Sequence, residues 1–158
     1  MRGENPASFF KCDENNTDKI KTPNETSNQG RILIVTDELN VIMPLCDLLF
    51  SRGYKVSGYS SGKKALTALR EQDFDVLLTD FEMSEMDGLG VLRSALNREP
   101  SLFGIILIGR DSIHRIIEAM NAGAFDYILK PVNLNELMLT ISRAMQMKPF
   151  AWNSKLHK

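Results

Sequence analysis

The sequence DVLLTDFEMSEMDG, residues 75–88, places a short apolar run directly before a carboxylate and an acidic, turn-prone segment. An unbroken run such as Val76 to Leu78 is typical of a strand that is buried on both faces, as in a parallel sheet. The residue after such a strand emerges at the carboxyl edge of the sheet, where open α/β folds bind ligands. Asp80 occupies this position, so we predict that the chain builds a pocket around its carboxylate.

On either side of this stretch, apolar runs of strand length alternate with apolar patterns of helical spacing. Four further strands are predicted, at residues 32–35, 55–59, 105–108 and 127–129. The alternation of five strands with five helices predicts a doubly wound α/β domain, with helices on both faces of a parallel sheet. We adopt the flavodoxin-like strand order 2-1-3-4-5 from known folds of this class, because the residues alone do not fix it.

The predicted helices carry recognisable start and stop residues. Asn133 and Glu136 have the spacing of a capping box, and Ser61 precedes an earlier helix as a cap. Asp111 or Ser112 is the expected cap of the helix that follows the fourth strand; Ile113, Ile116, Ile117 and Met120 share one face of it. These signals place helices between the predicted strands and after the last one.

Composition divides the chain into three segments. Residues 1–30 are polar and lack hydrophobic periodicity, so we expect a disordered extension. The folded domain is expected at residues 31–148 and a short tail at 149–158. Cys46 lies in an apolar helical pattern and is expected to be a small buried hydrophobic residue.

Charge and hydropathy limit the classes of partner. The net charge of -1 gives no support for a nucleic-acid or membrane surface. No segment approaches the roughly 18 consecutive apolar residues of a membrane span, and the polar amino terminus has no signal-peptide core. We therefore expect a cytoplasmic protein that contacts neither membrane nor nucleic acid directly.

Three charged residues directly follow predicted strands: Asp37 after the first, Asp80 after the third and Lys130 after the fifth. Alone, each would be an ordinary turn or capping residue. In the adopted strand order the two acids are neighbours, and their repulsion is relieved when a cation lies between them. Oxygen ligands in an open site suit Mg²⁺, which keeps waters and favours phosphate oxygen. An ammonium group opposite would balance an incoming phosphoryl group.

Three blocks of sequence carry a family resemblance. They are Val35-Thr36-Asp37-Glu38, Asp80 with Met83 and Met86-Asp87-Gly88, and the run AGAFDYILKP at residues 122–131. Occurring together and in this order, they resemble the response regulator receiver domain of two-component signalling, over roughly residues 31–147.

The resemblance implies a phosphorylation site built around Mg²⁺. Asp80 matches the aspartate that accepts a phosphoryl group from a histidine kinase or a phosphotransfer protein. Asp37 matches a direct magnesium ligand, and the backbone carbonyl of Glu82 would supply another. Lys130 matches the lysine that contacts the phosphoryl group, and the bond from it to Pro131 is expected to be cis.

The resemblance also implies how a signal would leave the domain. Tyr127 matches an aromatic switch residue, although an ordinary edge-strand aromatic is the alternative. Glu82 and Asp111 occupy positions that tune dephosphorylation in the family. The signal is expected to pass to a downstream protein through the face formed by the fourth helix, fifth strand and fifth helix, which is also a candidate homodimer interface. No enzymatic turnover is expected.

Three residues depart from the family pattern. Thr36 stands where the family usually has a second acid, so it is expected to hold at most a metal-bound water and to weaken magnesium binding. Gly109 stands where the family has Ser or Thr, which removes the usual hydroxyl–tyrosine coupling. Ser84 replaces a common proline.

Two alternatives remain open at this stage. One is a pseudo-receiver, which would use the fold as a docking module independent of phosphorylation. The other is a magnesium-dependent phosphatase with an aspartate nucleophile, similar to haloacid-dehalogenase-like enzymes. That class needs two aspartates two positions apart after its first strand, which Asp80-Phe81-Glu82 matches only approximately.

Overall fold

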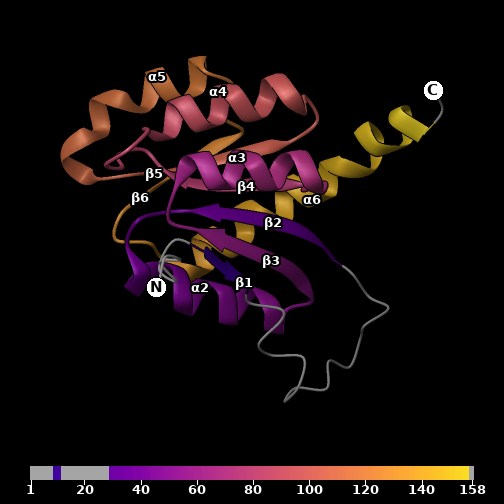
Figure 1. The fold of residues 1–158 in the computed structure, drawn as a ribbon, viewed down its shortest axis with the longest axis horizontal. Coiled ribbons are helices and arrows are strands. Elements are labelled where there is room, and N and C mark those ends of the chain that lie inside the picture. The colour runs from indigo at the N-terminus through magenta and orange to yellow at the C-terminus, as the bar shows by residue number, and fades with distance from the viewer. Residues whose placement is uncertain (1–8, 12–28, 157–158) are drawn as a thin grey trace, which may run out of the picture.

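The computed structural model describes residues 9–11 and 29–156 of the chain. Its sheet has six strands in the order β1-β3-β2-β4-β5-β6 (Figure 1). Five of them are parallel to one another: β2 Gly30–Val35, β3 Tyr54–Tyr59, β4 Val76–Asp80, β5 Phe103–Ile108 and β6 Asp126–Leu129. Counted along the chain, these five lie in the order 2-1-3-4-5, which confirms the predicted topology.

Helices cover both faces of this sheet. Consecutive strand residues point to opposite faces, so an unbroken apolar strand places apolar side chains on both faces, and each face needs a covering layer. Leu33 and Leu77 belong to a core shared with α3 Gly62–Glu71, α4 Gly88–Arg98 and α5 Ile116–Asn121. Ile34 and Leu78 belong to a second core, shared with α2 Leu39–Ser51 and α6 Leu134–Leu156 (Figure 1). The central strands are therefore buried on both sides, as their unbroken apolar runs predict.

Several predicted local signals are confirmed. The Ser61 hydroxyl accepts a hydrogen bond from the Lys64 amide at 3.3 Å and caps α3. The Asn133 side chain accepts from the Glu136 amide at 3.0 Å at the start of α6. Gly123, after α5, has a φ of 104°, a conformation that residues with a Cβ atom rarely adopt. The Lys130–Pro131 peptide bond is cis, as the resemblance implied.

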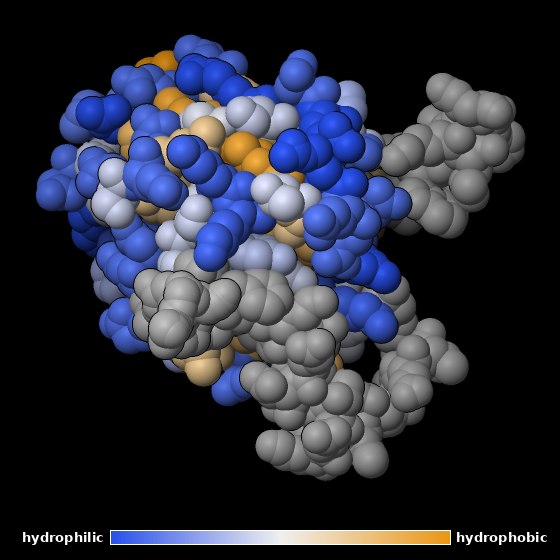
Figure 2. Space-filling view, viewed as in Figure 1, coloured by the Kyte–Doolittle hydropathy of each residue, from blue (hydrophilic) through white to orange (hydrophobic). Residues whose placement is uncertain are grey.

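The helix predicted after the fourth strand is the least accurate prediction. The segment starts instead as a 3₁₀ helix, η2 Arg110–Arg115, with neither Asp111 nor Ser112 as a side-chain cap, and α5 is only six residues long. Ile117 is 69% exposed, and Ile113 and Met120 are also exposed. Apolar groups are visible at the upper edge of Figure 2, where α5 lies. Helical spacing predicts that residues share a face, but not that another element covers it.

The chain ends also differ from prediction. Phe9–Lys11 forms strand β1, antiparallel to β3, within a segment predicted to lack regular structure. Gly30, at the end of the predicted extension, is the first residue of β2, and residues 1–8 and 12–28 lie outside the described residues. Helix α6 continues to Leu156, so residues 149–156 of the expected tail extend the last helix. A three-residue strand has too few positions for a periodic signal, and helix propensity alone does not locate a helix end.

Two further observations concern the body of the domain. Cys46 is buried in the α2–α6 core as predicted, but it is disulfide-bonded, which the prediction of a simple hydrophobic residue did not include. Two cysteines give no spacing pattern from which a disulfide can be predicted. Among the described residues, none of the helices is both long and apolar enough to cross a membrane.

Gly88 fixes the approach of α4 to the end of β4. Its amide donates to the Phe81 carbonyl at 2.7 Å, and a Cβ atom at this position would lie 2.0 Å from the Asp80 carbonyl oxygen. Gly90, two residues further into the same helix, has only ordinary van der Waals contacts around its Cβ position, with the nearest atoms at 3.4 Å. Both glycines thus lie in α4, but only Gly88 lies too close to the β4 backbone for a Cβ atom to fit.

We predict that Gly88→Ala destabilises the domain by about 1–3 kcal/mol, because the backbone around Asp80 must move. Gly90→Ala is the matched control and should be neutral or stabilising by up to about 1 kcal/mol, since alanine favours helix over glycine. Urea unfolding followed by circular dichroism measures both. Equal stabilities for the two variants would contradict this account of the β4–α4 turn.

Candidate functional site

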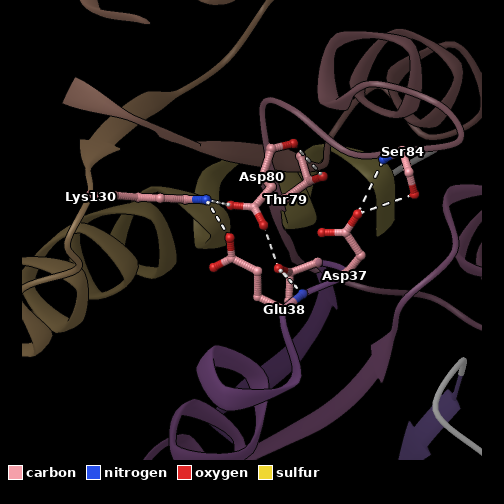
Figure 3. Close-up of polar contacts among 7 residues, drawn as sticks. Asp37, Glu38, Thr79, Asp80, Ser84 and Lys130 are labelled. Atoms are coloured by element: carbon pink, nitrogen blue, oxygen red, sulfur yellow. Dashed lines mark hydrogen bonds and ion pairs between the residues drawn. The ribbon is translucent and has the colours of Figure 1, made fainter. Parts of the chain in front are cut away.

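The predicted site residues meet at one edge of the sheet (Figure 3). β2, β4 and β6 are parallel, so their carboxyl ends lie on the same side, and Thr36, Asp80 and Lys130 stand at those ends. Strand pairing aligns Val35 with Thr79, which places the end of β2 beside the end of β4. The strand order therefore builds this cluster from segments far apart in sequence.

Asp80 lies at the centre of the cluster and is almost fully buried, with 1% of its surface exposed. Its two carboxylate oxygens have different partners: the Thr36 hydroxyl donates to Oδ2, and the Lys130 ammonium lies 2.7 Å from Oδ1. A buried carboxylate without partners would be costly, whereas one with a hydrogen bond and an ion pair is tolerated. The fold thus presents one charged, buried acceptor group at its edge.

Lys130 reaches Asp80 from the end of β6. Its amide donates to the Ile108 carbonyl at 2.9 Å, which anchors the backbone to β5, and its ammonium also lies 3.6 Å from the Glu38 carboxylate. Two acids on either side of one ammonium give this corner of the site a net negative charge. An ammonium held this way can shift between its carboxylate partners and an added phosphate oxygen.

The protonation equilibria reflect this mixture of burial and charge. Burial raises the pKa of Asp80 above its ordinary value, and the hydrogen bonds from Lys130 and Thr36 offset only part of that rise. Burial by itself lowers the pKa of Lys130, but the hydrogen bond and charge of Asp80, together with Glu38, bring it above its ordinary value. The rise in the pKa of Asp80 thus comes from burial, whereas the rise in the pKa of Lys130 comes from its contacts with Asp80 and Glu38.

Asp37 lies next to Asp80, on the side away from Lys130 (Figure 3). Unlike Asp80 it is exposed, and its Oδ2 accepts two hydrogen bonds from Ser84, at 3.2 Å from the amide and 3.3 Å from the hydroxyl. Ser84 belongs to the loop between β4 and α4. The hydrogen bonds from Ser84 therefore attach this loop to Asp37 at the acidic edge.

The donor set fits a magnesium ion. Asp37 and Asp80 offer carboxylate oxygens on neighbouring strands, and the Glu82 backbone carbonyl lies two residues beyond Asp80. Mg²⁺ binds such oxygen donors and keeps several waters. In the described part of the chain, no three His, Cys, Asp or Glu side chains come together as a metal cluster, so the remaining ligands would be waters or phosphate oxygens.

The predicted switch residues lie on the β5–β6 side of Asp80. Gly109 follows β5, and a Cβ atom there would meet only the Asp111 carboxylate, at 3.1 Å. Tyr127 is half-buried on β6, pairs with Ile106 and packs against the core shared with α3 and α4. Asp111 is exposed in η2. The backbone arrangement is that of the prediction, and the hydroxyl that would link Gly109 to its neighbours is missing.

Sequence reasoning missed three contacts of this edge. Glu38 was not predicted to approach Lys130, and Ser84 was considered only as a loop change. Ser112 was considered only as a helix cap, but its buried hydroxyl donates to the Glu82 carboxylate at 3.2 Å. For Glu38 a signal existed, since it directly follows Asp37 at a strand end. The other two depend on loop geometry.

Comparisons with known proteins agree with the geometry. The family model described as "Response regulator receiver domain" matches residues 32–142. The transcriptional regulatory protein ZraR of Klebsiella oxytoca is 36% identical over 120 residues, which are 76% of this chain and 27% of ZraR. The regulatory protein AtoC of Escherichia coli is 36% identical over 119 residues, which are 75% of this chain and 26% of AtoC. The chain spans about a quarter of the length of these relatives.

Solved structures show the same architecture over the whole domain. The crystal structure of a response regulator receiver domain protein from Clostridium thermocellum has 32% sequence identity and a TM-score of 0.72; the match covers 77% of this chain and 98% of that one. Family match, strand order and the acidic edge with its lysine thus agree. On this evidence the chain belongs to the response regulator receiver domain family of two-component signalling.

Proposed function

We propose that Asp80 accepts a phosphoryl group from a histidine kinase or a phosphotransfer protein, and that this chain acts as a signalling module without enzymatic turnover. The observation that carries this proposal is the burial of the Asp80 carboxylate between the Thr36 hydroxyl and the Lys130 ammonium. A buried carboxylate held in a fixed orientation is a positioned nucleophile. The relatives are regulators, which supports a signalling role.

In the proposed step, an Asp80 carboxylate oxygen attacks the phosphorus atom of a phosphohistidine. The new oxygen–phosphorus bond forms as the phosphorus–nitrogen bond breaks, and the donor imidazole keeps the electron pair and takes up a proton. The product is an acyl phosphate on Asp80. Lys130, already 2.7 Å from Asp80, would contact the phosphoryl oxygens and reduce their charge repulsion with Asp80 and Glu38.

A magnesium ion would serve the same site. When bound, it would screen the negative charges of carboxylate and phosphate from each other. Asp37, Asp80 and the Glu82 carbonyl are the residues that would hold it, with Thr36 contributing at most through a water. Asp37 would have to turn its Oδ2 from Ser84 toward the ion or use its other oxygen.

The output of the domain would run through protein contacts. Exposed apolar side chains on α5 and α6, among them Ile117, Met120 and Leu139, support a downstream partner or a homodimer at the α5–β6–α6 face. The name of ZraR, a transcriptional regulatory protein, supports a role in the regulation of transcription as part of a longer protein, and AtoC is named a regulatory protein. A cytoplasmic location and the absence of direct nucleic-acid contact by this domain remain parts of the proposal.

Gly109 favours an altered switch over the usual one. With no hydroxyl at this position, phosphorylation cannot draw Gly109 toward the site through a side chain. The Ser112–Glu82 hydrogen bond offers another link between the phosphoacceptor loop and η2. If the altered switch does not operate, the domain is the phosphorylation-independent docking module predicted as the first alternative.

We predict that acetyl phosphate with Mg²⁺ adds one phosphoryl group per chain and that Asp80→Asn abolishes the addition, because an amide oxygen is a poor nucleophile. Intact-protein mass spectrometry measures the added mass. Asp75→Asn, which leaves the edge cluster intact, serves as the control and should keep the label. If the folded wild-type chain takes up no label, the phosphorylation-independent docking module is the remaining function. Repeated turnover of a phosphomonoester would instead favour the magnesium-dependent phosphatase.

A second prediction concerns the missing hydroxyl. Gly109→Thr should enlarge the acetyl-phosphate-dependent NMR shifts of Tyr127, since the cavity at Gly109 admits a side chain once the exposed Asp111 carboxylate moves slightly. Gly109→Val is the matched control, with the same shape and no hydroxyl. If both variants respond alike, hydroxyl coupling is not what this chain lacks.

A third prediction follows from the raised pKa of Asp80 in the folded state. The stability that this shift contributes is present below the unfolded-state pKa and is lost as pH rises through the folded-state pKa. Asp80→Asn removes the buried charge, so its gain in stability over wild type, measured in EDTA, should widen as pH rises above the unfolded-state pKa of about 4. Urea midpoints measure the difference, and Asp47→Asn, on the exposed side of α2, is the control. A gap that narrows with rising pH would contradict the burial effect.

A further inference from the structure

The two acids at this edge are already provided with hydrogen-bond donors from the protein itself. Asp37 and Asp80 lie side by side at the ends of β2 and β4 (Figure 3). Such a pair repels unless positive charge or donors compensate. Lys130 compensates Oδ1 of Asp80, Thr36 donates to Oδ2 of Asp80, and Ser84 donates to Oδ2 of Asp37.

The direction of the Thr36 hydrogen bond is fixed by its surroundings. Its Oγ1 accepts a hydrogen bond from the Glu38 amide at 3.1 Å, so the hydroxyl hydrogen is left for Asp80 Oδ2. Thr36 is fully buried, so water does not compete for this hydrogen. An ionised carboxylate only accepts hydrogen bonds, and an acid at position 36 would offer no such donor.

Ser84 acts on the second acid in the same way. Its amide and its hydroxyl both donate to Asp37 Oδ2, and the Asp37 carboxylate is held between Asp80 and the β4–α4 loop (Figure 3). Proline at position 84 would have neither an amide hydrogen nor a hydroxyl, so it could make neither bond to Asp37. The pair of donors therefore comes from the identity of this residue and not from the loop backbone alone.

We propose that Thr36 and Ser84 hold the two carboxylates with hydrogen bonds from the protein itself and thereby set the affinity of this edge for a divalent cation. A cation that ligates Asp80 Oδ2 or Asp37 Oδ2 must displace a donor that is already in place. Thr36 thus lowers cation affinity by competition, in addition to any effect of the charge that an acid would have supplied. The inference rests on the proposed magnesium-dependent function of the same site.

Replacing the hydroxyl by a methyl group separates competition from charge. Thr36→Val keeps the net charge and nearly the shape of the side chain but leaves Asp80 Oδ2 without its donor. If only charge mattered, Mg²⁺ affinity would stay the same. With competition, the affinity should rise about tenfold, which corresponds to about 1.4 kcal/mol.

The experiment is a magnesium titration of the full, unphosphorylated chain, followed by calorimetry and by amide NMR shifts of the site. Thr79→Val is the matched control: Thr79 is an equally buried neighbour, but its hydroxyl donates to the Asp80 backbone carbonyl at 3.1 Å and not to a carboxylate. Its affinity should equal that of wild type. Ser84→Ala should raise the Mg²⁺ affinity less than Ser84→Pro, because proline also removes the amide donor. In the double variant Thr36→Val with Ser84→Pro, the two gains in Mg²⁺ affinity should multiply if the sites are independent.

An affinity for Thr36→Val that is equal to or below that of wild type overturns the proposal, as does the absence of magnesium binding in every folded variant. Amide spectra that match the wild-type fold exclude misfolding as the cause. The acetyl-phosphate label on wild-type Asp80 is scored separately. A label without the affinity rise rejects this inference alone, whereas an affinity rise without a label rejects the phosphorylation proposal and keeps the competition.

Discussion

The charge on Asp80 is the constraint on which the rest of the structure depends. Removing a carboxylate from water costs several kcal/mol even after the protein relaxes. The structure offsets this cost with Lys130 from the end of β6 and Thr36 from the end of β2. Neither residue would reach Asp80 if β4 did not lie between β2 and β5. Loss of either partner would leave the buried charge only partly compensated, so the site depends on the strand order that brings both partners to Asp80.

The partners of the acidic edge fall into two groups that differ in how they can move. Thr36, Asp80 and Lys130 are attached to strand ends whose backbones pair within the sheet. Glu38, Ser84 and Ser112 lie in connections or short helical turns, where a shift disturbs few buried contacts. Phosphorylation would therefore be felt first by the second group. The frame around Asp80 stays fixed while its outer ring of hydrogen bonds can be exchanged.

The elements of the fold and the site differ in how well they could be predicted from the amino-acid sequence. Asp37, Asp80 and Lys130 were placed correctly, because apolar runs locate strand ends and parallel strands share an edge. The five-strand order came from known folds, since no local pattern encodes it. The exposure of Ile117 and the 3₁₀ start of η2 were missed. Periodic spacing of apolar residues predicts that they share one helix face, but it does not predict whether another element packs on that face. Ser84 and Ser112 were missed because side-chain hydrogen bonds across loops depend on backbone geometry that spacing does not reveal.

Strand β1 has a consequence for the outer side of the sheet. It pairs Phe9 to Lys11 with Tyr59 to Ser57, the second half of β3, and so covers that part of the β3 border. An open border strand invites another chain to add to it, and proteins commonly block such borders to avoid aggregation. This chain covers part of one border with its own early residues. The opposite border of the described sheet is β6, which carries Tyr127 and is directly followed by Lys130, so an added strand there would lie beside the acidic edge.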